Sequence, residues 1–516
     1  MYAPASLFLF TFQLMYFIIL MYDKTAGKPE TMEKNRMRIF DTNVQELKYK
    51  VLMELAWQTW RGNDAFMVFN EIANEIVKKG ENPMSCCIYK DRAIVAERIR
   101  IALGGDRNNP NVIQVIGIAC DECPEAGHVV TDLCRGCVAH RCADGCKLGA
   151  ITFDEEQRAH INKEKCVECG KCAKLCPYSA ITNFKRPCER SCKVDAIRMA
   201  KDGVATIDSE KCIACGACVY QCPFGATLDV SSITDVIKTI MASENNEKFH
   251  VYAMVAPAIG GQFTYARPGQ IITAIKELGF YSVEEAAMGA DIVAYHEAQE
   301  LSEKDGGYMT SSCCPAFVKY IKTKFPNVEP NISSSLSPMA EAGRVIKAAD
   351  PDARVVFIGP CTAKKAEVRN PEVNKYIDYV MTFEELQAMI DSKDIIVEEL
   401  PETDLAEASR FGRKFARTGG VTEAVQEAIR EHGFDDLEFN PIVCDGVDKC
   451  KTALLRANKG VLPNNFIEGM VCTGGCIGGA ACLSHGDANK AAIDKYGDSA
   501  AMPDIRTAVE TAENRK

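Results

Sequence analysis

The chain has 516 residues, a formal net charge of −11 and 26 cysteines. Its 47% hydrophobic and 25% charged residues exclude a disordered chain and suit two to four globular domains of about 150 residues each. The acidic balance argues against nucleic-acid binding, and the tight spacing of the cysteines favours metal sites over the disulfides of short secreted domains.

The chain begins with an apolar run over residues 7–22. This run is shorter than the ~20 residues of a membrane-spanning helix, and no Lys or Arg precedes it, as a signal peptide would require. Basic residues follow, which would keep the rest of the chain cytoplasmic if the run inserted. Two interpretations stay open for residues 1–31: a membrane anchor, or an upstream start codon with the working protein beginning near Met32. Both predict a cytoplasmic location.

A helical N-terminal region is predicted for residues 32–119. Apolar residues recur at helical spacing between residues 43 and 79, and a further helix over residues 92–103 ends at Gly104-Gly105. The stretch "NVIQVIGIAC" is typical of a buried strand that leads into Cys120. A cysteine-rich domain is predicted over residues 120–242, because this segment holds most of the closely spaced cysteines.

From Phe249 onward, predicted apolar strands that end at glycines alternate with charged helices, as in "ARVVFIGPC" followed by "FEELQAMI". This alternation is typical of α/β architecture. The polar stretch from residue 243 to 248 marks the boundary, so residues 243–516 are predicted to form the last domain.

The cysteine-rich domain contains an internal repeat. Four half-repeats read "CKLGAI", "CPYSAI", "CKVDAI" and "CPFGAT", which predicts two stacked modules of the α+β ferredoxin type.

Two motifs in this domain have the spacing of bacterial ferredoxins that hold two cubane clusters: "CVECGKCAKLCP" from Cys166 and "CIACGACVYQCP" from Cys212. Three closely spaced thiolates hold one cube, and the fourth cysteine reaches the other cluster. Applied to these two motifs, the rule predicts the two ligand sets Cys166, Cys169, Cys172, Cys222 and Cys212, Cys215, Cys218, Cys176. Zinc is the alternative, but it typically uses two separated pairs.

Eight further cysteines are enough for two more cubanes, which makes four in all, with one extra cluster or a zinc site as the alternative. They are Cys120, Cys123, Cys134, Cys137, Cys142, Cys146, Cys188 and Cys192. Spacing does not fix how these eight pair. His128 and His140 lie among them, and we expect both to pack or hydrogen-bond rather than ligate. A row of clusters carries single electrons, so the remaining half of the chain is expected to house a redox reaction.

Cysteines of another kind lie in three stretches of the C-terminal half: "TSSCCPAF", "GPCTAKKAE" and "EGMVCTGGCIGG". None has ferredoxin spacing, so the ligands of one centre must converge from distant loops, as they do at the strand ends of α/β folds. Cys444, Cys450 and Cys482 receive no role, nor do Cys86 and Cys87, which are expected to be structural.

These three stretches resemble the signature motifs of the iron–iron (FeFe) hydrogenases, most of all the group B branch. The resemblance implies a monomeric enzyme whose α/β catalytic domain follows ferredoxin-like cluster domains and a short helical region. It also implies an H-cluster, in which a 4Fe-4S cubane is bridged to a two-iron subcluster with carbonyl, cyanide and a dithiolate. The implied cubane ligands are Cys314, Cys361, Cys472 and Cys476, the last of which also bridges to the two irons.

The resemblance gives the other residues roles as well. Cys313 would stay a free thiol that passes protons, and Glu297, Glu300 and Ser333 would continue the proton path, with Lys304 where the family usually has Arg. Paired glutamates on a helix are otherwise most simply explained as solvated surface. Lys364 would hold a cyanide ligand by a charge-assisted hydrogen bond, and Met470 would pack on the cluster.

Two departures concern the surroundings of the cluster. Gly359 stands where the family has Met, which removes a side chain that would shield the two irons, and the third motif continues as "GGAACL". Groups around the ligands tune redox potential and solvent access, so these changes bear on catalytic bias and oxygen sensitivity.

The resemblance implies the interconversion of protons and electrons with dihydrogen. Electrons would pass through the cubanes to ferredoxin or a similar carrier, and maturation proteins would insert the two-iron group. No dinucleotide fingerprint is present, so NAD(H) is not expected. Two alternatives remain: a hydrogen or redox sensor, and an electron-transfer scaffold without the two-iron site.

Overall fold

The computed structural model describes residues 40–63, 69–80, 83–121, 123–124, 126–304 and 306–515. The apolar run of residues 7–22, with its two interpretations, lies outside this part of the chain. Within the described residues, no helix combines the length and the apolar character needed to span a bilayer.

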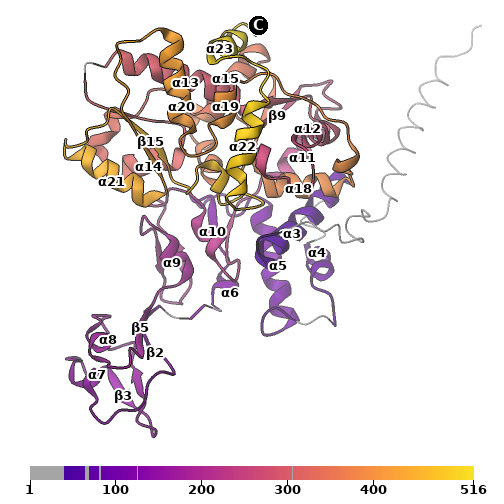
Figure 1. Cartoon of the computed structure of the whole chain (residues 1–516). Coiled ribbons are helices and arrows are strands. Elements are labelled where there is room, and N and C mark those ends of the chain that lie inside the picture. Colours follow the sequence, from indigo (N-terminus) through magenta and orange to yellow (C-terminus); the bar gives the residue numbers. More distant parts are fainter. Residues whose placement is uncertain are drawn as a thin grey trace, which may run out of the picture.

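Three helices form the N-terminal region, as predicted: α3 (Asn43–Trp60), α4 (Phe69–Ile76) and α5 (Ile88–Ala102). Thr42 caps α3 by accepting from the Gln45 amide at 3.1 Å, which satisfies one of the free N–H groups of the first turn. Helix α3 packs on α11 (Ile233–Ala242) and α18 (Phe383–Ser392) of the C-terminal half. The N-terminal helices therefore lie directly against that half (Figure 1).

The cysteine-rich region folds into small modules with two-stranded sheets, which lie below the C-terminal half in Figure 1. Its strands are β1 (Ile113–Val115), β2 (Gly127–Val130), β3 (Ile151–Phe153), β4 (Ala159–Ile161), β5 (Ile181–Phe184), β6 (Ile197–Met199), β7 (Ala205–Ile207) and β8 (Thr227–Asp229). Its helices are α6 (Gly117–Cys120), α7 (Arg141–Asp144), α8 (Lys171–Leu175), α9 (Pro187–Ser191) and α10 (Ala217–Gln221).

One module is inserted into the other. Strand β1 pairs with β8, and β6 with β7, whereas β2 pairs with β5, and β3 with β4. We call residues 127–184 the inserted module, and residues 113–124 with 187–229 the outer module. The sequence places the start of this region at residue 120, but β1 lies further towards the N-terminus.

The C-terminal half contains two parallel sheets, in the strand orders β10-β9-β12-β13 and β11-β15-β14. Their strands are β9 (Val251–Val255), β10 (Ser282–Glu285), β11 (Met309–Thr310), β12 (Arg354–Gly359), β13 (Tyr379–Thr382), β14 (Pro441–Asp445) and β15 (Phe466–Met470). Strands such as "VYAMV" and "RVVFIG" are apolar on both faces because helices cover both sides of a parallel sheet. The predicted α/β class is confirmed.

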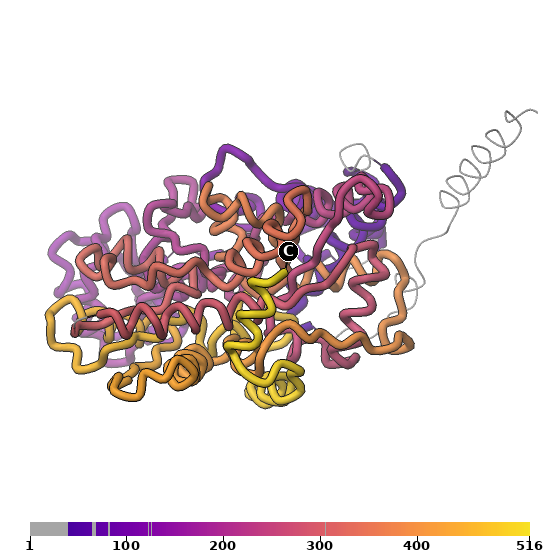
Figure 2. Tube along the Cα trace, turned by 90° about the horizontal axis from the view of Figure 1, so that it is seen from above, coloured from indigo at the N-terminus to yellow at the C-terminus, as the bar shows by residue number. Residues whose placement is uncertain are grey.

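Helices surround the two sheets: α12 (Pro268–Glu277), α13 (Ala286–Ser302), α14 (Pro315–Lys324), α15 (Pro338–Ala349), α16 (Thr362–Glu367), α17 (Pro371–Asn374), α19 (Arg410–Lys414), α20 (Gly420–His432), α21 (Val447–Asn458), α22 (Ala488–Asp498) and α23 (Ile505–Glu513). Helix α13 is buried over most of its length and packs on α15, α20 and α23. Figure 2 looks down on the face that carries the C-terminus, opposite the cluster modules.

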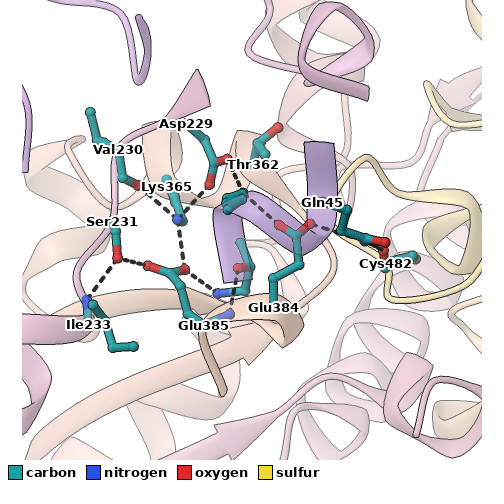
Figure 3. A network of polar contacts seen from close by, with 12 residues as sticks. Gln45, Asp229, Val230, Ser231, Ile233, Thr362, Lys365, Glu384, Glu385 and Cys482 are labelled. Carbon is teal, nitrogen blue, oxygen red and sulfur yellow. Dashed lines mark hydrogen bonds and ion pairs between the residues drawn. The ribbon is translucent and has the colours of Figure 1, made fainter. Parts of the chain in front are cut away.

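A buried ionic network joins the cluster modules to the C-terminal half (Figure 3). Lys365 on α16 donates to Asp229 of β8 and to Glu385 of α18, both at 2.8 Å. Lys48 on α3 bridges Asp229 and Glu384, at 2.6 and 2.5 Å. Burial alone would raise the pKa of Asp229, but the charges of Lys365 and Lys48 outweigh it and lower that pKa. Three parts of the chain are therefore held by one charge cluster.

We expect Lys365→Met to destabilise the fold by about 3–5 kcal/mol, because it leaves two buried carboxylates short of a partner. The matched control is Lys375→Met, which removes an exposed pair with Glu372 and should leave the free energy of unfolding nearly unchanged, because solvent screens such a pair. Anaerobic denaturant titration measures both. Equal effects of the two substitutions would contradict this role of the network.

Candidate metal centres

The four cysteines expected to hold the catalytic cubane follow the ends of parallel strands. Cys361 comes after β12 and caps α16, and Cys314 follows β11 and caps α14. Cys472 and Cys476 lie in the loop after β15. Strands β11 and β15 are parallel neighbours in one sheet, whereas β12 belongs to the other, so the three loops come from strand ends of both sheets.

The thiols are close enough to affect one another's ionisation. Burial, followed by the charges of Cys361 and Cys314, raises the pKa of Cys476 to about 12. The same two neighbours add to the effect of burial on Cys472, whose pKa lies well above its ordinary value. An iron cluster that neutralises four thiolates would relieve this repulsion. The quartet therefore fits a metal cluster.

Close backbone packing holds the loops in this position. A Cβ on Gly479 would lie 2.5 Å from the Pro360 carbonyl oxygen, and Ala481 donates to the same oxygen at 3.2 Å. The third motif is thus seated directly on the residue before Cys361. A Cβ on Gly469 would lie 2.1 Å from the Phe317 ring, so α14, which begins after Cys314, packs tightly on β15.

Gly359 lies in closely packed surroundings at the end of β12. A Cβ there would lie 2.8 Å from the Phe357 ring and 2.9 Å from the Ala256 methyl group. A larger residue at this position would therefore require Phe357 or Ala256 to shift. The loss of shielding expected from Gly359 stays a prediction.

Cys313 lies next to a buried carboxyl group. Its side chain is buried, and burial together with the charge of Glu297 raises the pKa of Cys313 well above its ordinary value. Glu297 accepts from the Ser312 amide at 3.2 Å, and Ser333 lies close enough to lower the carboxyl pKa. Burial nevertheless dominates and raises the pKa of Glu297 to about 8. Glu297 is fully buried, so the alternative of a solvated pair of glutamates does not hold for it.

The second glutamate, Glu300, follows Glu297 on α13. Glu300 accepts from both the amide and the hydroxyl of Ser334, each at 2.9 Å. Its charge reaches Lys304, whose pKa is lowered by burial. The structure therefore brings the predicted proton-path residues into one row and adds Ser334. The run of three serines, "SSS", gave no signal for which of them bonds Glu300.

Lys364 is buried on α16 and donates to the Ser337 hydroxyl at 2.8 Å. It also forms an ion pair with Glu367 at 2.7 Å. Burial alone would lower the pKa of Lys364, but Glu367 and the thiolates of Cys361 and Cys313 outweigh it and raise that pKa. The ammonium group therefore lies near both thiols, where an anionic ligand would be held.

The remaining C-terminal residues of interest are buried. Met470 ends β15, and its carbonyl accepts from the Cys450 thiol at 3.5 Å. Cys482 donates to the Ile477 carbonyl at 3.3 Å, and Cys444 is also buried. At the other end of the chain, Cys87 caps α5 beside Cys86. These contacts suit structural thiols.

The cluster-module cysteines belong to two separate hydrophobic cores. Cys172 packs with Cys134, Cys142, Cys146 and Cys176 in the inserted module. The outer module gathers another set: Cys120, Cys188, Cys192, Cys212, Cys215, Cys218 and Cys222. The predicted exchange, in which Cys176 joins the Cys212 motif and Cys222 joins the Cys166 motif, is therefore wrong, because each fourth cysteine lies in the module opposite to the one expected.

The inserted module completes two sets from its own residues. A cavity of about 240 Å³ is lined by four thiols, those of Cys146, Cys166, Cys169 and Cys172. The pKa of Cys142 is raised by burial and by the thiols of Cys137 and Cys176, which places these two near Cys142, with Cys134 in the same core. Among the described residues, no three His, Cys, Asp or Glu side chains lie within reach of a single metal ion. Thiols spread around a cavity suit a four-iron cube.

The two histidines of this module behave differently. The Nδ1 atom of His128 lies 2.6 Å from the Glu168 carboxylate, so this ring nitrogen forms a hydrogen bond. His140 stacks on Phe153 with ring centroids 3.8 Å apart, and its buried Nε2 has no hydrogen-bond partner. Packing and hydrogen bonding, as expected, account for both rings apart from this one nitrogen.

The outer module contacts the loops that carry Cys361 and Cys472. Thr362, next to Cys361, donates to the Ala214 carbonyl at 2.7 Å. A Cβ on Gly216 would lie 2.5 Å from the Ala480 methyl group, so the loop around Cys215 approaches the third motif closely. A cavity of about 630 Å³ between the two is lined by Cys192, Cys215 and Cys472, among others.

The comparisons with known proteins agree with this arrangement. Residues 249–480 match the family model of the iron-only hydrogenase large subunit, C-terminal domain. Residues 205–226 match a 4Fe-4S binding domain, and residues 133–180 match a 4Fe-4S dicluster domain, which lies within the inserted module.

Several relatives match part of this chain. Iron hydrogenase 1 of Clostridium pasteurianum is 29% identical over 309 residues, which cover 49% of this chain and 53% of that protein. The periplasmic Fe hydrogenase large subunit of Nitratidesulfovibrio vulgaris is 29% identical over 287 residues, with coverages of 45% and 68%. The match thus spans about half the length of the Clostridium protein.

Two further comparisons are with a cluster assembly factor and with a solved structure. The cytosolic Fe-S cluster assembly factor NAR1 of Yarrowia lipolytica is 29% identical over 145 residues, 25% of this chain and 30% of that protein. A solved FeFe-hydrogenase variant from Chlamydomonas reinhardtii has a TM-score of 0.46 and 20% identity, covering 55% of this chain and 94% of that one.

The Glu297 carboxyl should titrate near pH 8 rather than near its ordinary value of 4.5, because burial disfavours its charge. Its protonated carbonyl band should therefore persist at neutral pH in an infrared titration and disappear in Glu297→Gln. Since the raised pKa favours the protonated form, the stabilising effect of Glu297→Gln should grow as the pH rises from 4.5 to about 8. The control is Glu300→Gln, and a carboxyl that titrates at its ordinary value would contradict the burial argument.

Proposed function

We propose that this protein is an FeFe hydrogenase, which interconverts protons and electrons with dihydrogen. One observation carries the proposal: a buried thiol, Cys313, lies between a quartet of converging cysteines and a buried carboxyl group that can hold a proton at neutral pH. A cluster that only carries electrons needs no proton donor beside it, whereas hydrogen chemistry needs both.

In this proposal, Cys314, Cys361, Cys472 and Cys476 would hold the cubane, with Cys476 also serving the two-iron group. When bound, that group supplies the metal site at which dihydrogen is made or split. Lys364, fixed by Ser337 and Glu367, would hold a cyanide ligand by a charge-assisted hydrogen bond. Met470 would pack against the cluster and help to exclude water.

Protons would move between the site and the surface along the row described above. The Cys313 thiol exchanges a proton with Glu297, and Ser333 relays it towards Glu300. Lys304 and Ser334 stand at the outer end. Each hydroxyl or carboxyl group in this row can accept a proton on one side and donate one on the other.

Electrons would enter through the cysteine modules. The loop around Cys215 lies against Thr362 and Ala480, so the last auxiliary cluster would be next to the catalytic one. The inserted module lies farther out (Figure 1), where ferredoxin or a similar one-electron carrier would dock. The proposal also requires maturation proteins that insert the two-iron group, and it places the chain in the cytoplasm. The altered second and third motifs suggest a group B enzyme.

A second candidate function is a scaffold or electron-transfer protein without the two-iron group. The matches to cytosolic Fe-S cluster assembly factors favour it. This candidate makes no use of Cys313, nor of Lys364 near Cys313 and Cys361. No domain that would favour a sensor is identified by the family comparisons.

Infrared spectroscopy tests the proposal on protein purified without oxygen after co-production with hydrogenase maturases. We expect bands of iron-bound carbonyl and cyanide. Their absence in protein whose cubanes are full would leave the scaffold function in place of the hydrogenase.

Cys313→Ala should retain those bands but lower hydrogen turnover by about 100-fold or more, the usual contribution of a positioned proton donor. Cys450→Ala, which alters a buried thiol away from the proposed proton path, is the matched control. Full turnover in Cys313→Ala would show that protons take another route.

A further inference from the structure

The outer module repeats the hydrogen bonding of the inserted module. In the inserted module, Thr131 donates to the Ala180 carbonyl at 2.8 Å, and in the outer module Ile116 donates to the Ala226 carbonyl at 2.7 Å. Both bonds extend the terminal strand pair, β2 with β5 and β1 with β8. The two modules therefore have equivalent frameworks, although one of them is interrupted in sequence.

Amide-to-sulfur hydrogen bonds make the thiols equivalent as well. Ala159 donates to the Cys134 sulfur at 3.4 Å, and Ala205 donates to the Cys120 sulfur at 3.3 Å. Both alanines begin the second strand of a hairpin, β4 and β7. Cys120 thus has the place in the outer module that Cys134 has in the inserted one.

A second pair of amide-to-sulfur hydrogen bonds is also equivalent in the two modules. Ala150 donates to the Cys146 sulfur at 3.3 Å, as Ala196 does to Cys192 at 3.2 Å. The correspondence of the two modules therefore equates two sets of cysteines: Cys134, Cys137, Cys142, Cys176 and Cys120, Cys123, Cys188, Cys222. The second set is divided by the insertion, which separates Cys123 from Cys188.

The divided set is nonetheless assembled in space. Cys120, Cys188 and Cys222 pack in one hydrophobic core, and the Cys123 amide donates to the Cys120 carbonyl at 3.3 Å. All four thiols are thus neighbours, and no matched family model includes Cys120, Cys123 or Cys188.

Two buried arginines lie at this set. Arg186 is 2% exposed and places Nη1 at 3.6 Å from the Cys120 sulfur. Arg98, on α5, is 3% exposed and donates through Nη2 to the Phe224 carbonyl at 3.0 Å. Its Nε and Nη1 have no hydrogen-bond partner among the described residues, and Cys222 lies close enough to raise the pKa of Arg98 against the lowering effect of burial. Two buried N–H donors without partners are costly unless an anion accepts from them.

We propose that Cys120, Cys123, Cys188 and Cys222 hold a 4Fe-4S cluster across the insertion, and that Arg98 and Arg186 make it the most easily reduced cluster of the two modules. A cubane with four thiolates is an anion, and its sulfides accept hydrogen bonds. One-electron reduction adds a negative charge without a proton, so two neighbouring guanidinium groups stabilise the reduced form and raise the potential.

The inserted module lacks this charge at the equivalent position. His140 precedes α7 as Arg186 precedes α9, and histidine carries less positive charge at neutral pH than arginine. The cluster of the Cys134 set should therefore have the lower potential. Electrons arriving from outside would move from the inserted module into the outer one, towards the catalytic half.

Iron analysis tests the ligand set on the full chain, reconstituted without the two-iron group. Cys188→Ser should lose about four irons per chain, the content of one cubane, and so should the positive control Cys137→Ser. The negative control Cys450→Ser should lose none. Unchanged iron in Cys188→Ser, or zinc at this position in the parent protein, would overturn the proposal.

Redox titration followed by electron paramagnetic resonance tests the arginines. Arg98→Met and Arg186→His should retain all iron but shift one cluster, the first to be reduced, to a lower potential. Arg100→Met, which alters a half-exposed arginine paired with Glu97, should shift none. If Arg98→Met does not fold, Arg186→His still decides, since an unshifted first signal would exclude any influence of the arginines on this cluster. Neither test depends on the proposed hydrogen chemistry.

Discussion

The structure depends on the buried charge cluster around Lys365. This lysine lies four residues after Cys361 on the same short helix, and it binds carboxylates from β8 and α18. Lys48 extends the cluster to the N-terminal helix. Because a buried ion is tolerated only with its partners in place, the distance between the outer module and the thiols of the C-terminal half cannot change without exposing or unpairing charge. The relative position of these two sets of cysteines is thus set by electrostatics rather than by a linker.

Local spacing made much of the site predictable. The strand-to-helix alternation of the C-terminal half gave its fold class, because period and composition are local properties. The motifs around Cys314, Cys361 and Cys476 predicted a convergence of distant loops, which in the structure follow strand ends of both sheets. Glu297 could be identified only through the family resemblance, since a glutamate pair on a helix carries no signal of burial.

The fourth-cysteine pairing could not be predicted by spacing alone. Cys176 and Cys222 end the two most similar motifs, but those motifs belong to different modules. The partner of the Cys212 motif is interrupted by the inserted module, so half of it precedes residue 124 and half follows residue 187. The position of Arg98 beside a cysteine set could not be predicted from the sequence either. Arg98 lies on a helix outside the cysteine-rich region and reaches Phe224 only in the folded chain.

The inserted module leaves and rejoins the outer one at a single point. Arg186 donates from Nε to the Pro124 carbonyl at 3.0 Å and from Nη2 to the Cys123 carbonyl at 3.2 Å, so the outgoing and returning segments run side by side. A domain whose two ends emerge together can be gained or lost in evolution without rethreading its host. The inserted module is therefore a separable unit, whose loss would leave both ends of the outer module next to each other.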